Sequence, residues 1–262
     1  MDALEKWVAK NRILAWILMD LLFGFALFVL IDNIIVFAVL MLVIILINYL
    51  FVESSVIRLM IKPLVSYQEG DPEPLLNTTA ELLTYRLTDA NRLTVAMNYC
   101  VALREHHRYE EALDLLLSVN VDRPSSGASP VIKFVYYNNL SDLYDLLGED
   151  APRDLYAQKA LQIYNDLPDG RAKKNYLPTF RVLSASLDYR AGEYDRALQT
   201  LLPLPEKPPV SKLEYSFLVA KVLLAAGQRA QATEYLSQII ENGRNLGVVR
   251  RARNLLSSLE QN

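Results

Sequence analysis

The side chains best suited to chemistry in this sequence are one cysteine and two histidines. Cys100 is the single cysteine, and His106 and His107 are adjacent. Nucleophilic catalysis needs a base close to the nucleophile, and a metal site needs clustered ligands. Adjacent residues at a helix end point about 100° apart instead of converging. We therefore expect Cys100 to be a buried, inert thiol and the histidines to be turn residues.

Two pairs of acidic residues are the remaining candidates for acid–base chemistry. Glu110-Glu111 and Glu149-Asp150 both lie beside predicted turns, at helix starts, where the helix dipole favours negative charge. The sequence has no GxGxxG, no phosphate-binding P-loop and no HExxH motif. We expect no enzyme activity, no catalytic residue, no metal site and no cofactor.

Two apolar segments of 19 residues, Ile13–Ile31 and Ile34–Val52, lie on either side of Asp32-Asn33. Each would cover roughly 28 Å as a helix, close to the hydrocarbon thickness of a bilayer. Neither has the polar face of a soluble core helix. The sequence predicts a transmembrane helical hairpin. A cleaved signal peptide is disfavoured because the first apolar run exceeds about 7–15 residues and contains Asp20.

Asp20 and Asn48 are the strongly polar residues within the two apolar segments. Asp20 lies 12 residues before the first residue of the Asp32-Asn33 turn, and Asn48 lies 15 residues after the second. In an antiparallel hairpin their depths differ by roughly 4.5 Å, which allows a side-chain hydrogen bond. Ionisable residues inside a membrane are functional candidates. The favoured alternative is a contact that locks the hairpin or joins two copies of the chain.

Basic residues flank the apolar segments on one side only. The five that precede the first segment or follow the second are Lys6, Lys10, Arg12, Arg58 and Lys62. The connecting turn has no basic residue, so the positive-inside rule predicts that both termini and the soluble part are cytoplasmic. One cysteine excludes an intrachain disulfide, as expected in a reducing compartment. We expect an integral protein of the cell membrane.

The sequence divides into an N-terminal hairpin with an interfacial segment (1–66), a linker (67–74) and a soluble domain (75–262). Glu53–Val65 mixes apolar and basic residues, which is typical of a helix that leaves the membrane and lies at its surface. Tyr67–Pro74 is acidic and contains proline and glycine, which favours a linker. The net charge of −3 and the lack of a basic stripe favour no nucleic-acid partner.

Paired amphipathic helices repeat along the soluble domain, so the predicted fold class is all-α. Four segments each contain a helix, a tight turn and a second helix: Tyr99–Leu117, Leu140–Leu161, Ser184–Leu202 and Val219–Ile240. The turns fall at His107, Gly148, Gly192 and Gly227, with separations of 41, 44 and 35 residues. The last amphipathic segment, Asn245–Leu259, is expected to be a capping helix.

This pattern resembles the tetratricopeptide family, whose repeat is about 34 residues long. The matching residues include Gly192-Glu193-Tyr194 followed by Ala197, and Arg108-Tyr109 followed by Ala112. His107 in place of glycine and Arg229 in place of the aromatic residue depart from the pattern. The resemblance implies a solenoid of helical hairpins in which Ala160, Ala197 and Ala232 lie at helix–helix contacts. It names no ligand.

A solenoid of helix pairs offers a concave face, lined by one stripe of each first helix. We expect a protein or peptide partner to bind there, to an adaptor or scaffold. The predicted partner-binding residues are Asn138, Asp142, Asp145, Ser186, Tyr189, Arg190 and Lys221. A solvated surface without a partner is the alternative for this stripe. Alternatives for the whole chain are an accessory or assembly subunit of a membrane complex, recognised through its hairpin, and an intracellular peptide sensor; a homo-oligomer is also compatible with the sequence.

Overall fold

The computed structural model describes residues 2–202 and 209–260, so Gln261 and Asn262 of the predicted 75–262 domain lie outside the described residues. Helices account for 83% of the described residues, and no strand is found among them, which confirms the all-α prediction. The helices are α1 (Asp2–Lys10), α2 (Arg12–Leu30), α3 (Ile34–Gln68), α4 (Glu73–Leu83), α5 (Asp89–Glu105), α6 (Tyr109–Ser118), α7 (Pro130–Leu147), α8 (Asp150–Asn165), α9 (Arg171–Arg190), α10 (Tyr194–Leu201), α11 (Pro209–Ala225), α12 (Arg229–Asn242) and α13 (Gly247–Glu260), with a 3₁₀ turn at Pro124–Ser126.

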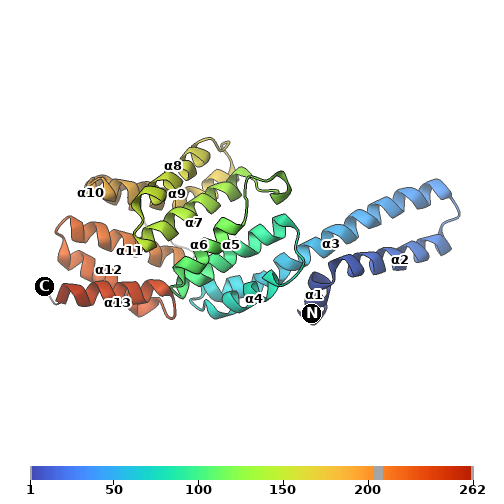
Figure 1. Cartoon of the computed structure of the whole chain (residues 1–262), viewed down its shortest axis with the longest axis horizontal. Coiled ribbons are helices and arrows are strands. Elements are labelled where there is room, and N and C mark those ends of the chain that lie inside the picture. The colour runs from blue at the N-terminus through green and yellow to red at the C-terminus, as the bar shows by residue number, and fades with distance from the viewer. Residues whose placement is uncertain (1, 203–208, 261–262) are drawn as a thin grey trace.

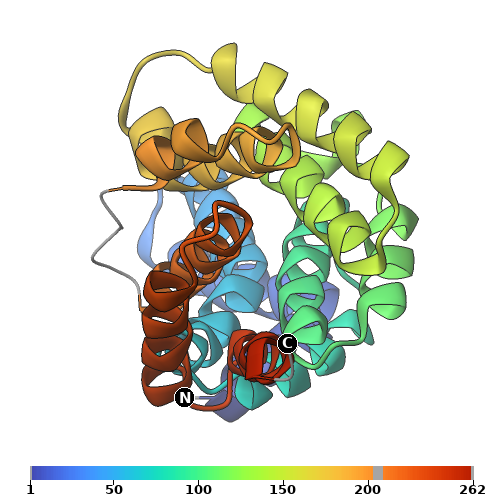
Figure 2. The ribbon, with the colours of Figure 1, turned by 90° about the vertical axis from the view of Figure 1, so that its left-hand side faces the viewer.

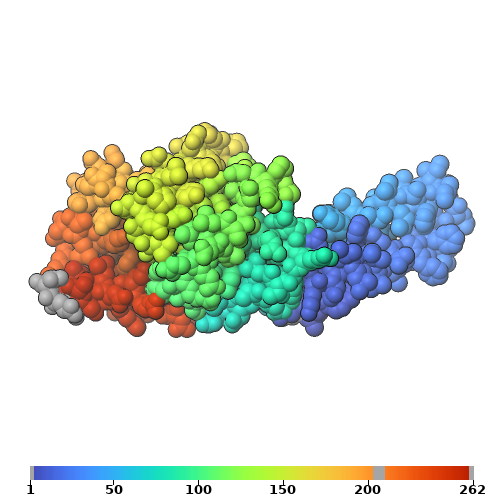
Figure 3. All heavy atoms as spheres, viewed as in Figure 1, coloured from blue at the N-terminus to red at the C-terminus, as the bar shows by residue number. Residues whose placement is uncertain are grey.

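Helices α2 and α3 form an apolar hairpin that projects from one end of the molecule (Figures 1 and 3). Both are long and apolar enough to cross a membrane, and only 6% of the most apolar stretch of each is buried within the chain. That exposure distinguishes them from core helices of a soluble protein. At the tip, the Asn33 side chain caps α3 by accepting hydrogen bonds from the backbone N–H groups of Ile35 (3.0 Å) and Val36 (3.2 Å).

Helix α3 continues past the apolar segment without a break and becomes part of the helical body. Val56 and Met60 are buried against Leu82, Tyr85 and Val95 of the following elements. The sequence predicted an interfacial helix over residues 53–65; this segment buries one face in the body, while its opposite face stays exposed. Residues 67–74, predicted as a linker, comprise the end of α3, a short turn and the first two residues of α4.

The helix pairs α5–α6, α7–α8, α9–α10 and α11–α12 share one turn geometry. The residue at each turn, His107, Gly148, Gly192 or Gly227, has a left-handed backbone with φ between 59° and 79°. In the α7–α8 turn, the N–H of Gly148 donates to the Asp145 carbonyl (3.2 Å) and the N–H of Glu149 to the Tyr144 carbonyl (2.9 Å). The same two hydrogen bonds recur in the other three turns. Glycine favours this conformation, and His107 adopts it as a non-glycine residue.

A further helix pair, α3–α4, was not predicted from the sequence. Its turn residue, Gly70, also has a left-handed backbone (φ 95°) and the same two turn hydrogen bonds, made here by Gly70 and Asp71. This pair could not be recognised in the sequence, because the apolar pattern of the first half of α3 continues directly into the pattern of a repeat helix. The body therefore contains five helix pairs and the final helix α13.

The alanines predicted at helix–helix contacts are buried, although Arg153 replaces the small residue five positions after the α7–α8 turn. Ala112, Ala160, Ala197 and Ala232 are each fully buried. Cys100 is 2% exposed, and burial raises the pKa of its thiol to about 12, against a weaker opposing effect of Arg104. A thiol in this environment stays protonated and inert at neutral pH.

Viewed along the long axis of the molecule, the helix pairs follow one another around a ring (Figure 2). The first helices of successive pairs touch in the order α5, α7, α9 and α11, and α13 contacts both α11 and α5. Helix α13 was predicted as a capping helix at the end of a solenoid. It does cover the last pair, but it also contacts α5 of the second pair and so closes the ring.

The packing of α3 leads to a prediction about excision of the body. A fragment that begins at Leu75 lacks Val56, Met60 and the Tyr67 contact to Glu105, whereas a fragment that begins at Glu53 keeps them. Loss of two buried apolar side chains costs about 4 kcal/mol or more. We expect both fragments to be helical by circular dichroism and the shorter one to unfold at clearly lower urea concentration. Equal midpoints would show that α3 contributes nothing to the body.

Candidate partner-binding surface inside the ring

The predicted partner-binding residues lie on the first helices of three successive pairs, and most of them contact one another across the helix boundaries. Asn138, Asp142 and Asp145 come from α7, Ser186, Tyr189 and Arg190 from α9, and Lys221 from α11. Helical spacing of three or four residues puts the members from each helix on one face. The contacts join these faces into a polar surface on the inner side of the ring, which we call the inner face.

Helices α5 and α7 meet through Arg104 and Asp142. The Arg104 Nη1 atom lies 3.5 Å from Asp142 Oδ2, and the Asn138 amide donates to the same oxygen over 3.2 Å. Asp142 keeps 38% of its side-chain surface accessible. Asn138 is only 7% exposed, so its amide serves to position Asp142 and little of it is available to a partner. The sequence had predicted that Asn138 and Asp142 both contact the partner.

Helices α7 and α9 meet through Asp145 and Arg190. Arg190 Nη2 donates to Asp145 Oδ1 over 2.8 Å, and Arg190 Nη1 lies 3.7 Å from Asp154 on α8. Arg153, which stands where the repeat pattern has a small residue, lies 3.6 Å from Asp145. The side chains of Asp145 and Arg190 are 34% and 19% exposed. This four-membered ion network is therefore enclosed by the ring but still reached by water.

Helices α9 and α11 meet through Tyr189 and Lys221. The Lys221 ammonium lies 5.3 Å from the centre of the Tyr189 ring, within the range of a cation–π interaction. Burial lowers the pKa of Lys221, and the attraction of Asp145 opposes this effect. Ser186 lies one turn before Arg190 on α9 and is half-buried.

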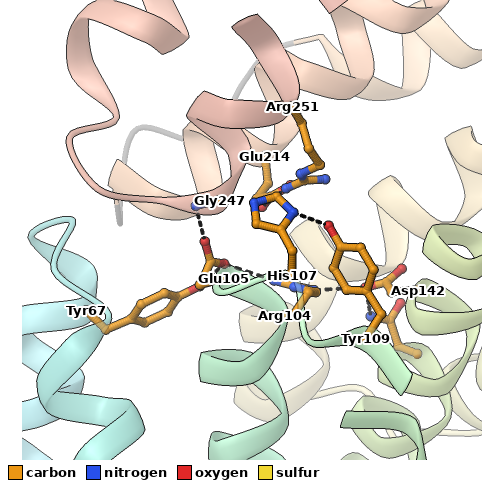
Figure 4. Close-up of polar contacts among 10 residues, drawn as sticks. Tyr67, Arg104, Glu105, His107, Tyr109, Asp142, Glu214, Gly247 and Arg251 are labelled. Carbon is orange, nitrogen blue, oxygen red and sulfur yellow. Dashed lines mark hydrogen bonds and ion pairs between the residues drawn. The ribbon is translucent and has the colours of Figure 1, made fainter. Parts of the chain in front are cut away.

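Helix α13 completes the circuit through two contacts that the sequence did not predict. Arg251 Nη2 donates to Glu214 Oε1 of α11 over 2.5 Å. The backbone N–H of Gly247 donates to Glu105 Oε2 of α5 over 2.7 Å, and the Tyr67 hydroxyl donates to Glu105 Oε1 over 3.3 Å (Figure 4). Glycine is required at position 247, because a Cβ atom there would lie 2.7 Å from the Glu105 carbonyl oxygen. Polar contacts thus run around the whole ring, from α5 through α7, α9, α11 and α13 back to α5.

The loop before α13 also helps to close the ring, through contacts to the turn between α3 and α4. Arg244 donates from Nη1 to the Glu69 carbonyl (2.9 Å), and the N–H of Asn245 donates to the Gly70 carbonyl (3.3 Å). The turn of the first pair is thereby bound to the end of the last pair, 175 residues apart.

The charges inside the ring are close to balanced, and their pKa values reflect enclosure. Partial burial among the neighbouring helices raises the pKa of Asp142 to about 6, although its side chain keeps 38% of its surface and Arg104 opposes the shift. Burial also raises the pKa of Glu105. Burial acts in the same direction on Glu214, but Arg251 and Arg104 outweigh it and hold its pKa below the usual value.

Two donor atoms of the inner face make no hydrogen bond with any described residue. They are Nε of Arg104 and Nη1 of Arg190, and both are covered from solvent. Buried donors normally have acceptors. The acceptor nearest to Arg190 Nη1 is Asp154 Oδ1, at 3.7 Å.

In the hairpin, Asp20 and Asn48 form the contact that the count from the turn had allowed. The Asn48 amide donates to Asp20 Oδ1 over 2.7 Å. One turn beyond Asp20, a Cβ on Gly24 would lie 3.2 Å from the Met41 side chain, so glycine permits this close approach. A functional role for the Asp20–Asn48 pair stays a prediction.

The two histidines lie at the α5–α6 turn and do not converge. His107 Nδ1 shares a hydrogen bond with the Tyr109 hydroxyl (2.5 Å), whereas His106 Nε2 lies 3.7 Å from Glu73. Burial and the nearby Arg250 and Arg251 lower the pKa of His107 to about 4. A neutral His107 beside Tyr109 fits the turn role that the sequence suggested.

Comparison of this chain with protein-family models, with curated proteins and with solved structures found no match.

Proposed function

We propose that this chain is a membrane-tethered adaptor or scaffold whose inner face binds a protein or peptide segment. The observation that carries the proposal is the series of polar contacts between neighbouring helices of the inner face, with water-accessible carboxylates at Asp142 and Asp145. Polar groups of this kind recognise an extended segment with both donors and acceptors. No catalytic step is part of the proposal.

The five turns of common geometry support a tetratricopeptide-like arrangement of the body. Their separations of 37, 41, 44 and 35 residues, counted from Gly70 to Gly227, are close to or longer than the family period of about 34. In solenoids of this kind each helix pair contacts its neighbours, and the surface lined by the first helices binds partners. The closed circuit through α13 makes the proposed binding surface an enclosed one.

The exposed apolar hairpin supports the membrane tether. Trp16 and Tyr49 pack edge to face near its base, with ring centres 6.4 Å apart, as expected for aromatic residues at a membrane–water boundary. The flanking basic residues of the sequence support a cytoplasmic location for this base. Lys6, Arg12 and Arg58 are paired with glutamates here, which does not weaken the argument, since acidic residues contribute little to the positive-inside rule.

The proposed topology predicts opposite labelling at the two ends of the hairpin. In a Cys100→Ala background, Asp32→Cys places a thiol at the hairpin tip and Asn262→Cys places one at the C-terminus. We expect a membrane-impermeant maleimide to label the first variant and spare the second in intact cells, with both labelled after lysis. Labelling of the C-terminal probe in intact cells would reverse the proposed orientation.

The alternative function is an accessory or assembly subunit of a membrane complex, recognised through the hairpin. The Asp20–Asn48 hydrogen bond is the observation that favours it, because a polar pair within an apolar hairpin is available to exchange partners with another membrane helix. An intracellular peptide sensor would use the same inner face as the adaptor.

Paired variants separate the two functions in crosslinked membranes. Partner capture that is lost with Asp20→Leu and Asn48→Leu, but retained with Tyr189→Ala and Arg190→Ala, supports the subunit function. The adaptor function predicts the opposite pattern. Capture is scored on the same partner band throughout, and each variant is first shown to reach the membrane in wild-type amounts.

A further inference from the structure

A pocket of about 440 Å³ lies where the hairpin joins the body. Its walls come from the α1–α2 junction and from the loop between α4 and α5. The polar part of the lining contains Lys10, Arg12 and Arg86, and the apolar part contains Ile13, Leu14 and Leu87. Three cations and no carboxylate line this pocket, which is a composition suited to an anion. The volume is within the range of about 300–1,000 Å³ that small-molecule sites occupy.

The pocket walls are held together by hydrogen bonds, so the site is formed before a ligand arrives. The Arg12 guanidinium donates from Nη1 to the Arg86 carbonyl (3.3 Å), and its Nη2 lies 3.2 Å from Glu53 Oε1. Glu53 Oε2 in turn accepts from the Thr88 hydroxyl (3.2 Å) and the Asn91 amide (3.0 Å). Arg12 therefore fixes the α4–α5 loop against the base of the hairpin.

Two of the three cations keep their charge available. Glu53 balances Arg12, but the side chains of Lys10 and Arg86 are exposed and make no ion pair or hydrogen bond with any residue in 2–202 or 209–260. Glu81 is close enough for Lys10 to help lower its pKa, after the larger effects of Lys6 and Tyr85. That carboxylate is already bound by the Lys6 ammonium at 2.7 Å.

The pocket lies at the level where lipid headgroups would meet the protein. Ile13 and Leu14 are the first residues of the apolar segment. Trp16, about one turn further along α2, packs against Tyr49 of α3, and the two rings mark the membrane–water boundary. The cations thus face the headgroup region while the apolar part of the pocket faces the start of the acyl chains. Basic pockets at such a boundary bind anionic lipid headgroups.

We propose that this pocket binds the phosphate headgroup of an anionic phospholipid, with Lys10 and Arg86 as the ligand-binding cations and Arg12 as a positioning residue. The inference rests on the proposed membrane tether. A lipid bound there would contact the hairpin and the α4–α5 loop together, and so would fix the orientation of the ring relative to the membrane.

The test uses the full chain in a neutral detergent and the fluorescence of its two tryptophans, Trp7 and Trp16, which lie close to the pocket in the sequence. Dihexanoyl phosphatidylglycerol, dihexanoyl phosphatidylcholine and inorganic phosphate are titrated separately. The test variant combines Lys10→Gln with Arg86→Gln. The control combines Arg171→Gln with Lys174→Gln, which removes the same charge from exposed positions on α9.

We expect saturable binding of the anionic lipid by the wild type and the control, and affinity lower by on the order of tenfold in the test variant. Equal affinity in test variant and control would overturn the proposal, and so would binding of phosphatidylcholine as tight as that of phosphatidylglycerol. Inorganic phosphate that binds with the same affinity as the anionic lipid would assign the pocket to a free anion instead.

Carbonate extraction of the wild-type chain from cell membranes distinguishes failure of the tether from failure of the pocket. Extraction into the supernatant would overturn the membrane tether and remove the source of the lipid, and the lipid proposal with it. A chain retained in the pellet whose test variant binds lipid normally would overturn the pocket alone.

Discussion

Replacing Arg190 by alanine is expected to weaken partner binding by about 2 kcal/mol or more, which is roughly a 30-fold loss of affinity. Arg190 is the inner-face residue with a charged group at the centre of the circuit, an ion pair to Asp145 and a covered donor atom without a hydrogen bond. Stability should fall by no more than about 1 kcal/mol, because Arg153 still lies 3.6 Å from Asp145 after the change. A binding titration and a urea melt on the same protein measure both quantities.

Arg196→Ala is the matched control for this variant. Arg196 pairs with Asp188 over 2.5 Å, but its side chain is 61% exposed, and no contact joins it to the inner-face circuit. The control should bind the partner as the wild type does. Equal binding by Arg190→Ala, Arg196→Ala and the wild type would remove the inner face as the binding surface and leave the hairpin.

Replacing Glu105 by alanine is expected to destabilise the body by about 3 kcal/mol or more. Glu105 is 5% exposed and accepts hydrogen bonds from the Gly247 N–H and the Tyr67 hydroxyl, so it joins α5 to both α13 and α3. Its loss leaves buried donors without an acceptor and Arg104 without its neighbour at 3.7 Å. The free energy of unfolding from urea melts measures the effect.

Two further variants make the result on Glu105 specific. Glu105→Gln removes the charge but keeps an acceptor oxygen for the Gly247 N–H. It should therefore lose less stability than Glu105→Ala. Glu110→Ala removes an exposed glutamate from the next helix and should change stability by less than about 0.5 kcal/mol. Wild-type stability in Glu105→Ala would show that the contact between α13 and α5 does not hold the ring closed.

The features predicted correctly from the sequence are those determined by neighbouring residues. The turns at His107, Gly148, Gly192 and Gly227 and the buried small residues depend on helix periodicity and on local backbone preference, which a single sequence displays. The count along two helices joined by a short turn allowed an Asp20–Asn48 hydrogen bond, and the structure contains one. The stripe of inner-face residues came from aligning the repeats, although alignment could not reveal that Asn138 is buried.

The closure of the ring could not be predicted in this way. Glu105 and Gly247 lie 142 residues apart, and nothing in the composition around either residue identifies the other as its partner. The pair α3–α4 was missed for a different reason, since Val56 and Met60 read equally well as an interfacial helix or as a buried face. The position of Glu105 at the end of an apolar helical segment is the one local feature that could have indicated a buried carboxylate with a distant partner.

Site-specific photocrosslinking in membranes tests most directly whether the inner face binds the partner. A photoreactive amino acid is placed at Ser186 on the inner face, at Leu155 on the exposed surface of α8, and at Leu21 on the hairpin. We predict a discrete crosslinked product from position 186 that disappears when Arg190→Ala is added, and no such product from position 155. A product from position 21 with none from position 186 would contradict the adaptor function and identify the hairpin as the site of recognition.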